Sequence, residues 1–541
     1  REKSKQEYDF ISGLERLGGF GGKADLLNQY NTFLGAPDYF AKDYERYERI
    51  RAREIQEAVH QHLNTTSRLA VTFTPEVSRR PPILEFDRSC APSLGAKKAF
   101  HPPALGLARL ANGLTVIVSE RRDLPKVAVG LLVKSGAAAD SSHLAGTAWM
   151  TAEMLDEGTT SRSALQIQAE LDQLGTVLGT SAESEVSHAS FDTLRKHLKP
   201  SLELMADLVL NASFPEEELE RQRKQRLDNI LQERNSPPTI ARKVFRTVLF
   251  GEDHPFGRET AGNESSIQSL KRDDLVHFYR TYWMPNHAAL VFAGDISLDE
   301  AVRLAEGTLG AWQPGEVPSS DMPLVDAPQR LKTYLIDRQD APQSQVRIGS
   351  IGPRRKTEDL YAIELMNTVL GGAFSSRLNL NLREDKGYTY GASSSFAYGR
   401  RLGLWAAGAG VQTQFTGETL LEFRKELTQI RDQRPITTEE LEMAKENLTR
   451  GFSQRFETLG RLVDQVVDVV SFELPLEDIQ NYPRAIEQVS LEQAQSAALK
   501  YIDPDRAIAV IVGNLKQIGP PIRELKLGEV SVLDVFGRPV A

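Results

Sequence analysis

The stretch SIQSLKRDDLVHFYRTYWMPNHAALVFAGD, residues 266–295, joins an amphipathic helical pattern to an apolar strand that ends near glycine. The same order recurs in AIEQVSLEQAQSAALKYIDPDRAIAVIVGN, residues 485–514, and in YERIRAREIQEAVHQHLNTTSRLAVTFTPE, residues 47–76. Asp273 and Asp274 in the first copy, like Glu492 in the second, place a carboxylate in the first helical turn, where it suits the helix dipole. A threefold pattern of this length predicts one structural unit used three times.

If this unit closes a domain, the 541 residues contain two complete domains and the end of a third. Two connecting stretches are rich in proline, which can continue neither a helix nor a strand ladder. We therefore predict the following division: 1–75, remnant of a preceding domain; 76–100, linker; 101–310, first complete domain; 311–325, linker; 326–520, second complete domain; 521–541, tail.

Each complete domain opens with two strand patterns. The first opens with LTVIVSE and KVAVGLLVKSG, in which Val127, Val129, Leu131 and Val133 alternate with other residues, and the second opens with RLKTYLID and SQVRIGSIG. Helical periods follow, including a long charged helix over 215–234. The sequence predicts an α+β fold: two similar domains, each with a mixed, largely antiparallel sheet and helices packed on one face.

Composition excludes several function classes. Lys and Arg number 65 against 74 Asp and Glu, a net charge of −9 with interspersed signs, so no basic face for nucleic acid is indicated. No apolar run approaches the roughly 18 to 20 residues that span a bilayer. The single cysteine, Cys90, has no partner for a disulfide, and the nine histidines form no metal-binding motif. On its own residues, this chain lacks the groups of a hydrolase.

HLAGTAWMTAEMLDEGT, residues 143–159, resembles the helix on which zinc metallopeptidases of the pitrilysin and insulinase type carry their inverted motif H-x-x-E-H. Leu155 and the pair Gly158-Thr159 set the register of this resemblance. It implies that Trp149 and Glu153 stand where the two ligand histidines would be.

In the same register, Ala152 takes the place of the general-base glutamate, and in LDNILQERNSP Asn229 takes the place of the third ligand. A catalytic zinc site needs about three protein ligands and a base beside the metal-bound water. The resemblance therefore implies no metal and no cofactor in this chain, with Trp149 filling the space by packing.

FSSRLNLNLREDKGYTYGASSSF, residues 374–396, is similar to a segment of the family's later domain in which an Arg and a Tyr face the active-site chamber. Here these residues are Arg383 and Tyr390. Their donors could hydrogen-bond a substrate carbonyl and the charge that develops on it. Without the resemblance, the same residues would be interpreted as an exposed Arg and a half-buried strand Tyr.

The opening segment GLERLGGFGGKADLLNQYNTFLGAPDYFAKDYERY, residues 13–47, looks like the end of another copy of that later domain. The resemblance implies a zinc-bearing N-terminal half as partner, with the zinc in that half, and a peptide or unfolded protein as substrate. We expect the present chain to be inactive alone, to close the chamber and to hold peptide partly by extending a sheet edge. A periplasmic or secreted location is favoured over a cytoplasmic one.

The alternative is a structural or peptide-holding scaffold subunit in which neither half has peptidase activity. Both hypotheses share the fold and the replaced zinc positions. An H-x-x-E-H motif and a later Glu in the sequence that precedes residue 1 would distinguish the peptidase from the scaffold.

Overall fold

The computed structural model describes residues 1–63, 100–319 and 322–540. The chain divides into two compact units, residues 2–101 and, together with residue 1, residues 102–541. Each unit is described by itself. Cys90, the strand expected after residue 64 and nearly all of the predicted linker 76–100 lie outside the described residues.

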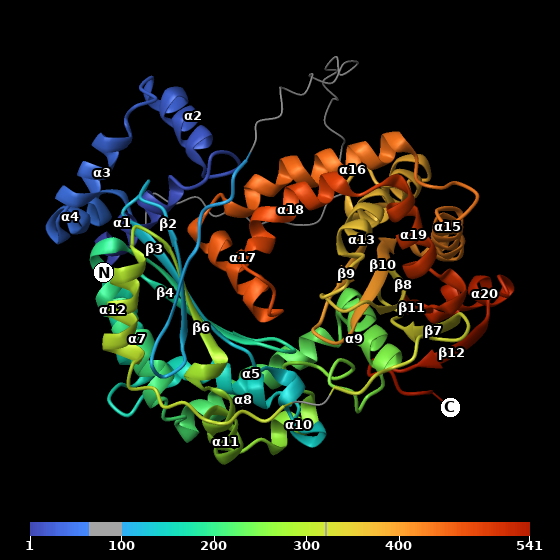
Figure 1. Cartoon of the computed structure of the whole chain (residues 1–541), viewed down its shortest axis with the longest axis horizontal. Helices are drawn as coiled ribbons and strands as arrows, with labels where there is room; N and C mark the ends of the chain where they lie inside the picture. The colour runs from blue at the N-terminus through green and yellow to red at the C-terminus, as the bar shows by residue number, and fades with distance from the viewer. Residues whose placement is uncertain (64–99, 320–321, 541) are drawn as a thin grey trace. The chain divides into compact units, whose positions relative to one another are not determined.

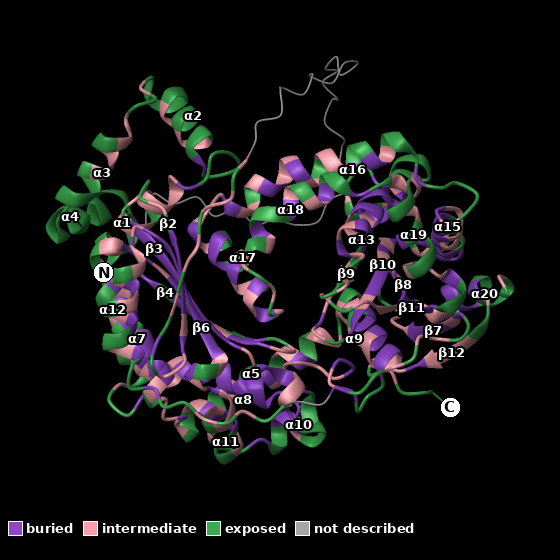
Figure 2. Ribbon diagram, in the orientation of Figure 1, coloured by how far each residue is buried: buried purple, intermediate pink, exposed green. Residues whose placement is uncertain are grey.

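The smaller unit is helical where it is described. It contains α1 Glu2–Gly13, α2 Lys23–Leu34, α3 Phe40–Arg49 and α4 Ala52–His62. The ring of Phe10 stacks on Phe40 and Tyr44, with ring centres 3.9 and 5.0 Å apart, and so joins α1 to α3. None of these four helices contains a buried residue, and Figure 2 shows them largely exposed.

The larger unit begins with a six-stranded sheet in the order β1-β2-β6-β3-β5-β4. β2 and β6 are parallel, and the other neighbours are antiparallel. Every residue of β3 is buried, as Figure 2 also shows, so both faces of this central strand are covered. The strands are β1 Gly106–Arg109, β2 Thr115–Glu120, β3 Lys126–Val133, β4 Val177–Ala182, β5 Ser187–Leu194 and β6 Ala288–Gly294.

Eight helices accompany this sheet within residues 100–319. They are α5 Thr147–Glu153, α6 Ala164–Leu174, α7 Leu198–Asn211, α8 Glu216–Glu233, α9 Pro237–Phe250, α10 Glu264–Ser269, α11 Arg272–Tyr282 and α12 Leu298–Leu309. Leucine, valine and methionine side chains of α5, α7 and α12 form one apolar core with the sheet.

A second six-stranded sheet follows, in the order β12-β7-β11-β8-β10-β9. Its strands β7, β11, β8, β10 and β9, in this order across the sheet, correspond in order and direction to β2, β6, β3, β5 and β4 of the first sheet. The strands that end the two described copies of the sequence repeat, β6 and β11, occupy the same place. The strands are β7 Lys332–Asp337, β8 Ser344–Gly352, β9 Thr389–Ala397, β10 Gly403–Val411, β11 Ile508–Gly513 and β12 Glu529–Leu533.

The helices of this second part are α13 Leu360–Asn367, α14 Arg377–Asn379, α15 Thr416–Gln429, α16 Thr438–Gly451, α17 Leu459–Ser471, α18 Glu477–Gln488, α19 Leu491–Tyr501 and α20 Leu515–Glu524. β12 pairs in parallel with β7. The expectation that 521–541 forms a tail is therefore wrong, because these residues supply the outer strand of the second sheet.

Two helices cross between the halves of this unit. α9, from the first half of the sequence, packs on β8 and β11 of the second sheet, and α17, from the second half, packs on β3 and β6 of the first (Figure 1). Side-chain alternation along β3 puts Gly130 on the face opposite Val129 and Leu131, and a Cβ on Gly130 would lie 2.6 Å from Val463 Cγ1 of α17.

The fold class is confirmed, since two mixed sheets carry helices in the predicted order. Helices on one face are only part of the arrangement, because α9 and α17 cover the second face of the other half's sheet. Among the described helices, none has both the length and the apolar character needed to cross a membrane.

Candidate functional site

The helix that would carry the zinc motif, α5, is fixed at its start by Asp140. One carboxylate oxygen of Asp140 accepts the backbone N–H of Gly146 at 2.8 Å, and the other accepts that of Ala148 at 2.9 Å. Burial raises the pKa of Asp140 to about 7, although these backbone donors act in the opposite direction. Gly146 has a φ of 96°, and a Cβ there would meet the backbone of Gly262 at 2.9 Å.

Trp149 on α5 lies beside Arg226 on α8. The guanidinium carbon of Arg226 is 5.7 Å from the centre of the indole ring, within the range of a cation–π contact. Arg226 is buried and donates to Glu233 at 2.7 and 3.3 Å, and to the carbonyls of Ala261 and Gly262 at 2.9 and 3.3 Å. A fixed positive charge with satisfied donors therefore stands against Trp149.

The other positions of the expected motif supply no metal site. Ala152 is fully buried, and Glu153 is half-buried, where burial and the charges of Asp156 and Glu157 raise its pKa. Asn229 accepts a hydrogen bond from Gln225 of its own helix at 3.2 Å. Tryptophan, alanine, one carboxylate and one amide do not fit zinc, which prefers imidazole, thiolate and carboxylate ligands. Within the described residues, no three His, Cys, Asp or Glu side chains gather as a metal site.

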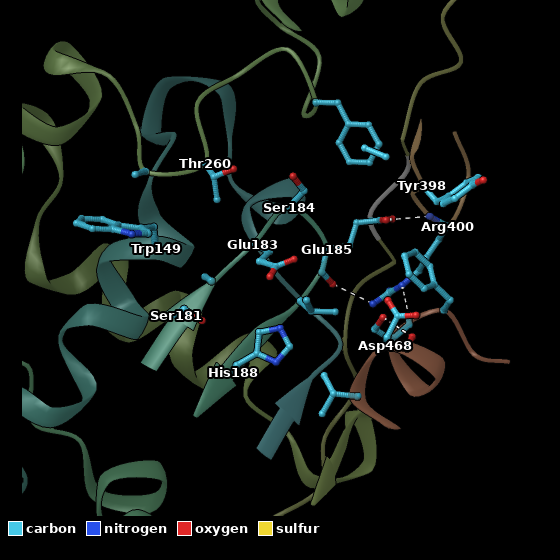
Figure 3. Close-up of a pocket in the computed structure, with 18 of the residues that line it drawn as sticks. Trp149, Ser181, Glu183, Ser184, Glu185, His188, Thr260, Tyr398, Arg400 and Asp468 are labelled. Atoms are coloured by element: carbon cyan, nitrogen blue, oxygen red, sulfur yellow. Dashed lines mark hydrogen bonds between the residues drawn. The ribbon is translucent and has the colours of Figure 1, made fainter. Parts of the chain in front are cut away.

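Trp149 lines a cavity of about 840 Å³ within the larger unit (Figure 3). Its walls come from β4 and β5, from α8 and α9, from the β9–β10 hairpin and from α17. Side chains of both charges face it. The carboxylates are Glu183, Glu185, Glu233, Glu259, Asp464 and Asp468, and the guanidinium groups are Arg226, Arg242, Arg246, Arg258 and Arg400.

Arg400, in the β9–β10 hairpin, joins the two halves at the edge of this cavity. Its backbone N–H donates to the Glu185 carboxylate at 2.8 Å, and its side chain donates to the carbonyls of Glu185 and Ser471, both at 2.9 Å (Figure 3). It also reaches the carbonyl of Lys134 at 3.3 Å. Because these acceptors lie just after β3, between β4 and β5, and at the end of α17, one arginine connects three segments.

His188 on β5 is the imidazole that lines the cavity. Burial lowers the pKa of His188 to about 4, so the ring is neutral at physiological pH. A neutral imidazole in this position adds no charge to the cavity wall.

The structure brings Arg383 and Tyr390 together, away from the residues that line the 840 Å³ cavity. Arg383 lies in a π-helical turn, Leu380–Asp385, and Tyr390 lies near the start of β9. The guanidinium carbon of Arg383 is 5.1 Å from the Tyr390 ring centre and 4.5 Å from that of Phe374. Tyr390 is 88% exposed and Phe374 67% exposed, so this cation–aromatic cluster faces solvent.

Sequence reasoning missed Arg226 and Arg400. Arg226 is one of several charged residues in ERQRKQRLDN, and nothing in that run distinguishes the member that turns inward. Arg400 follows the glycine of a hairpin, which resembles an ordinary exposed turn. An arginine beside a turn that must hold three segments together has no local sequence signal.

Two family models match successive parts of this chain. Residues 115–254 match the family model described as Insulinase (Peptidase family M16), and residues 269–448 match the model described as Peptidase M16 inactive domain. The chain is 24% identical over 406 residues to the uncharacterized zinc protease YmxG of Bacillus subtilis, covering 74% of this chain and 96% of that protein. It is 29% identical over 316 residues to the uncharacterized zinc protease Rv2782c of Mycobacterium tuberculosis, covering 56% and 71% of the two chains.

Solved structures share the fold. The peptidase M16 inactive domain from Pseudomonas fluorescens has a TM-score of 0.71 at 23% identity, covering 76% of this chain and 98% of its own. A protease from Helicobacter pylori has a TM-score of 0.69 at 20% identity, covering 76% and 100%.

Proposed function

Because the chain belongs to the insulinase family of peptidases, M16, we propose that residues 102–541 are the non-catalytic half of a zinc metalloendopeptidase. This half closes a chamber over the zinc site of a partner half and binds a peptide or an unfolded protein there. It performs no hydrolysis alone.

The contact between Trp149 and Arg226 carries this proposal. In the register set by the resemblance, Trp149 stands at a ligand position, and the cation beside it would repel Zn²⁺. The charge of Arg226 is compensated by Glu233, which also accepts a hydrogen bond from Lys243 at 2.8 Å. The Glu233 carboxylate, which lines the same cavity as Trp149, is thus already paired with two cations.

The edges of both sheets support a peptide-binding role. β4 ends the first sheet and β9 ends the second, so among the described strands each has a neighbour on one side only. An extended peptide can add to such an edge through main-chain hydrogen bonds. Tyr390 lies near the start of β9 and Arg383 contacts both Tyr390 and Phe374, so this cluster can contact the side chains of a peptide bound along this edge.

Three measurements on the purified chain test the proposal: zinc content, cleavage of an unstructured peptide, and binding of that peptide by fluorescence anisotropy. We expect binding without zinc and without cleavage. Cleavage that a chelator abolishes would contradict a non-catalytic half.

Adding the zinc-bearing half distinguishes the proposed peptidase role from the scaffold alternative. A chamber-closing half should raise the peptidase activity of that partner, whereas a scaffold subunit should bind its partner and leave hydrolysis unchanged. The absence of any peptide binding, together with no effect on the partner's activity, would reject the peptidase role.

A further inference from the structure

Three arginines meet where α9 lies on the second sheet. Arg242 and Arg246 are one turn apart on α9, so their side chains leave the same face of the helix. Arg347 on β8 stacks on the ring of Phe245, with its guanidinium carbon 5.2 Å from the ring centre. Phe245 lies between the two α9 arginines in sequence, and the charges of both arginines act on Arg347.

These cations are incompletely paired. The buried Nε of Arg347 has no hydrogen-bond partner in the part of the chain that the structure describes, and within those residues Arg242 has neither a hydrogen bond nor an ion pair. Arg246 donates to the carbonyl of Phe256 at 2.9 Å and to the Ser184 hydroxyl at 3.4 Å. A buried cationic donor without an acceptor is costly, which favours an anion from outside the chain.

Glu259, whose charge acts on Arg246, is already paired with another cation. The field of Glu259 acts on Arg246, but the Glu259 carboxylate pairs with Lys243 at 3.0 Å. Burial, and then the charges of Arg242 and Arg246, lower the pKa of Arg347. Arginine still keeps its proton at neutral pH, so the cluster carries uncompensated positive charge.

Of the three arginines, Arg347 lines a cavity of about 300 Å³ beside α9, whereas Arg242 and Arg246 line the 840 Å³ cavity described above. The floor of this cavity is made of small residues from two neighbouring strands, so a peptide main chain could approach the sheet closely. These residues are Gly391, Ser393, Ser395, Ala406, Gly408 and Gly410. The three strand-β9 members lie on the edge strand described above, next to the proposed path of a peptide.

We propose that Arg242, Arg246 and Arg347 form a subsite that binds a carboxylate of the peptide, so that this half favours acidic substrates. The inference rests on the proposed peptide binding. Guanidinium groups match carboxylates in charge and in planar geometry, and such hydrogen bonds are roughly twice as strong as neutral ones. The carboxylate can come from an Asp or Glu side chain or from the C-terminus of the peptide.

Three unstructured peptides of one sequence test the subsite by fluorescence anisotropy: amidated with a central Gln, amidated with a central Glu, and central Gln with a free C-terminus. We expect at least one carboxylate-bearing peptide to bind roughly tenfold more tightly than the neutral peptide. Tighter binding of the Glu peptide would assign the subsite to acidic side chains, and tighter binding of the free-terminus peptide would assign it to the C-terminal carboxylate.

Arg347→Gln and Arg242→Gln should each remove most of this gain and leave the neutral peptide unaffected. The matched control is Arg303→Gln, which removes the same charge from the exposed side of α12. Arg242 makes no hydrogen bond in the described residues, so its variant should keep the melting temperature. Equal binding of all three peptides, or an equal loss in Arg303→Gln, overturns the subsite and leaves peptide binding intact; no binding of any peptide rejects the proposed function itself.

Discussion

Arg226 and Glu233, seven residues apart on α8, are joined by two hydrogen bonds, from Nη1 to Oε1 at 2.7 Å and from Nη2 to Oε2 at 3.3 Å. The pair holds a positive charge against Trp149, in the region where related enzymes of this family are expected to hold zinc. If the proposed register is correct, a hydrogen-bonded cation lies beside one of the replaced ligand positions.

We expect the purified chain to hold no stoichiometric zinc at neutral pH and to cleave no unstructured peptide. Trp149, Ala152, Glu153 and Asn229 together offer at most one good ligand and no general base. Elemental analysis and a peptide assay measure both properties. One zinc per chain, released by Glu153→Gln or by Asn229→Ala, would show that the register of the resemblance is wrong.

Glu233→Ala should destabilise the protein by about 2 to 3 kcal/mol, because it leaves the buried Arg226 without its carboxylate. Urea unfolding measures the change. Glu203→Ala is the matched control, since it breaks an exposed pair with Lys199 on α7 and should cost less than about 0.5 kcal/mol. Similar losses of unfolding free energy in the two variants would mean that the buried Arg226–Glu233 pair stabilises the protein no more than an exposed pair.

Asp140 should make stability fall as pH rises from about 4 to about 7. Burial raises the pKa of Asp140 from its ordinary 3.8 to about 7, so in this range the folded state binds more protons than the unfolded state, and a rise in pH favours unfolding. Asp140→Asn removes the titration and should flatten this part of the stability profile. Urea midpoints at several pH values measure the slope; an unchanged slope in the variant contradicts the raised pKa.

Gly130→Ala should cost about 1 to 3 kcal/mol, since the added methyl would lie 2.6 Å from Val463 Cγ1. Val463→Ala in the same chain should recover part of that loss, and a double-mutant cycle measures the coupling. Gly179→Ala on β4 is the control, because nothing lies within 4 Å of its added Cβ. Additive effects of the Gly130 and Val463 changes would indicate that α17 does not rest on β3 as described.

Arg383→Ala and Tyr390→Phe should lower kcat for a peptide when the zinc-bearing half is present, by on the order of a hundredfold if these groups reach the reacting carbonyl. Both side chains are on the surface, so zinc content and melting temperature should remain nearly unchanged. Arg303→Ala serves as the control for lost surface charge. Wild-type turnover in both variants would assign Arg383 and Tyr390 a structural role.

The strands could be predicted from the sequence because their signals are local. SQVRIGSIG coincides with β8, and the two described repeat copies end in β6 and β11, which hold matching places. β12 also had a readable signal in the alternation of EVSVL. The partners of the helices could not be predicted, since the apolar face of α9 or α17 does not specify which sheet it covers. The inward turn of Arg226 likewise depends on carbonyls far away in the sequence.

The reciprocal placement of α9 and α17 suggests how the two repeats of this half arose and predicts how the half responds to cleavage of the chain. Each repeat lends one helix to the other, as two copies of an ancestral unit would if they first associated by exchanging that segment and were later fused. The packing of α9 and α17 on the opposite sheets would then hold the repeats together without the covalent connection between them. A protease that cut the chain between them would leave two fragments that stay together, each still completing the core of the other.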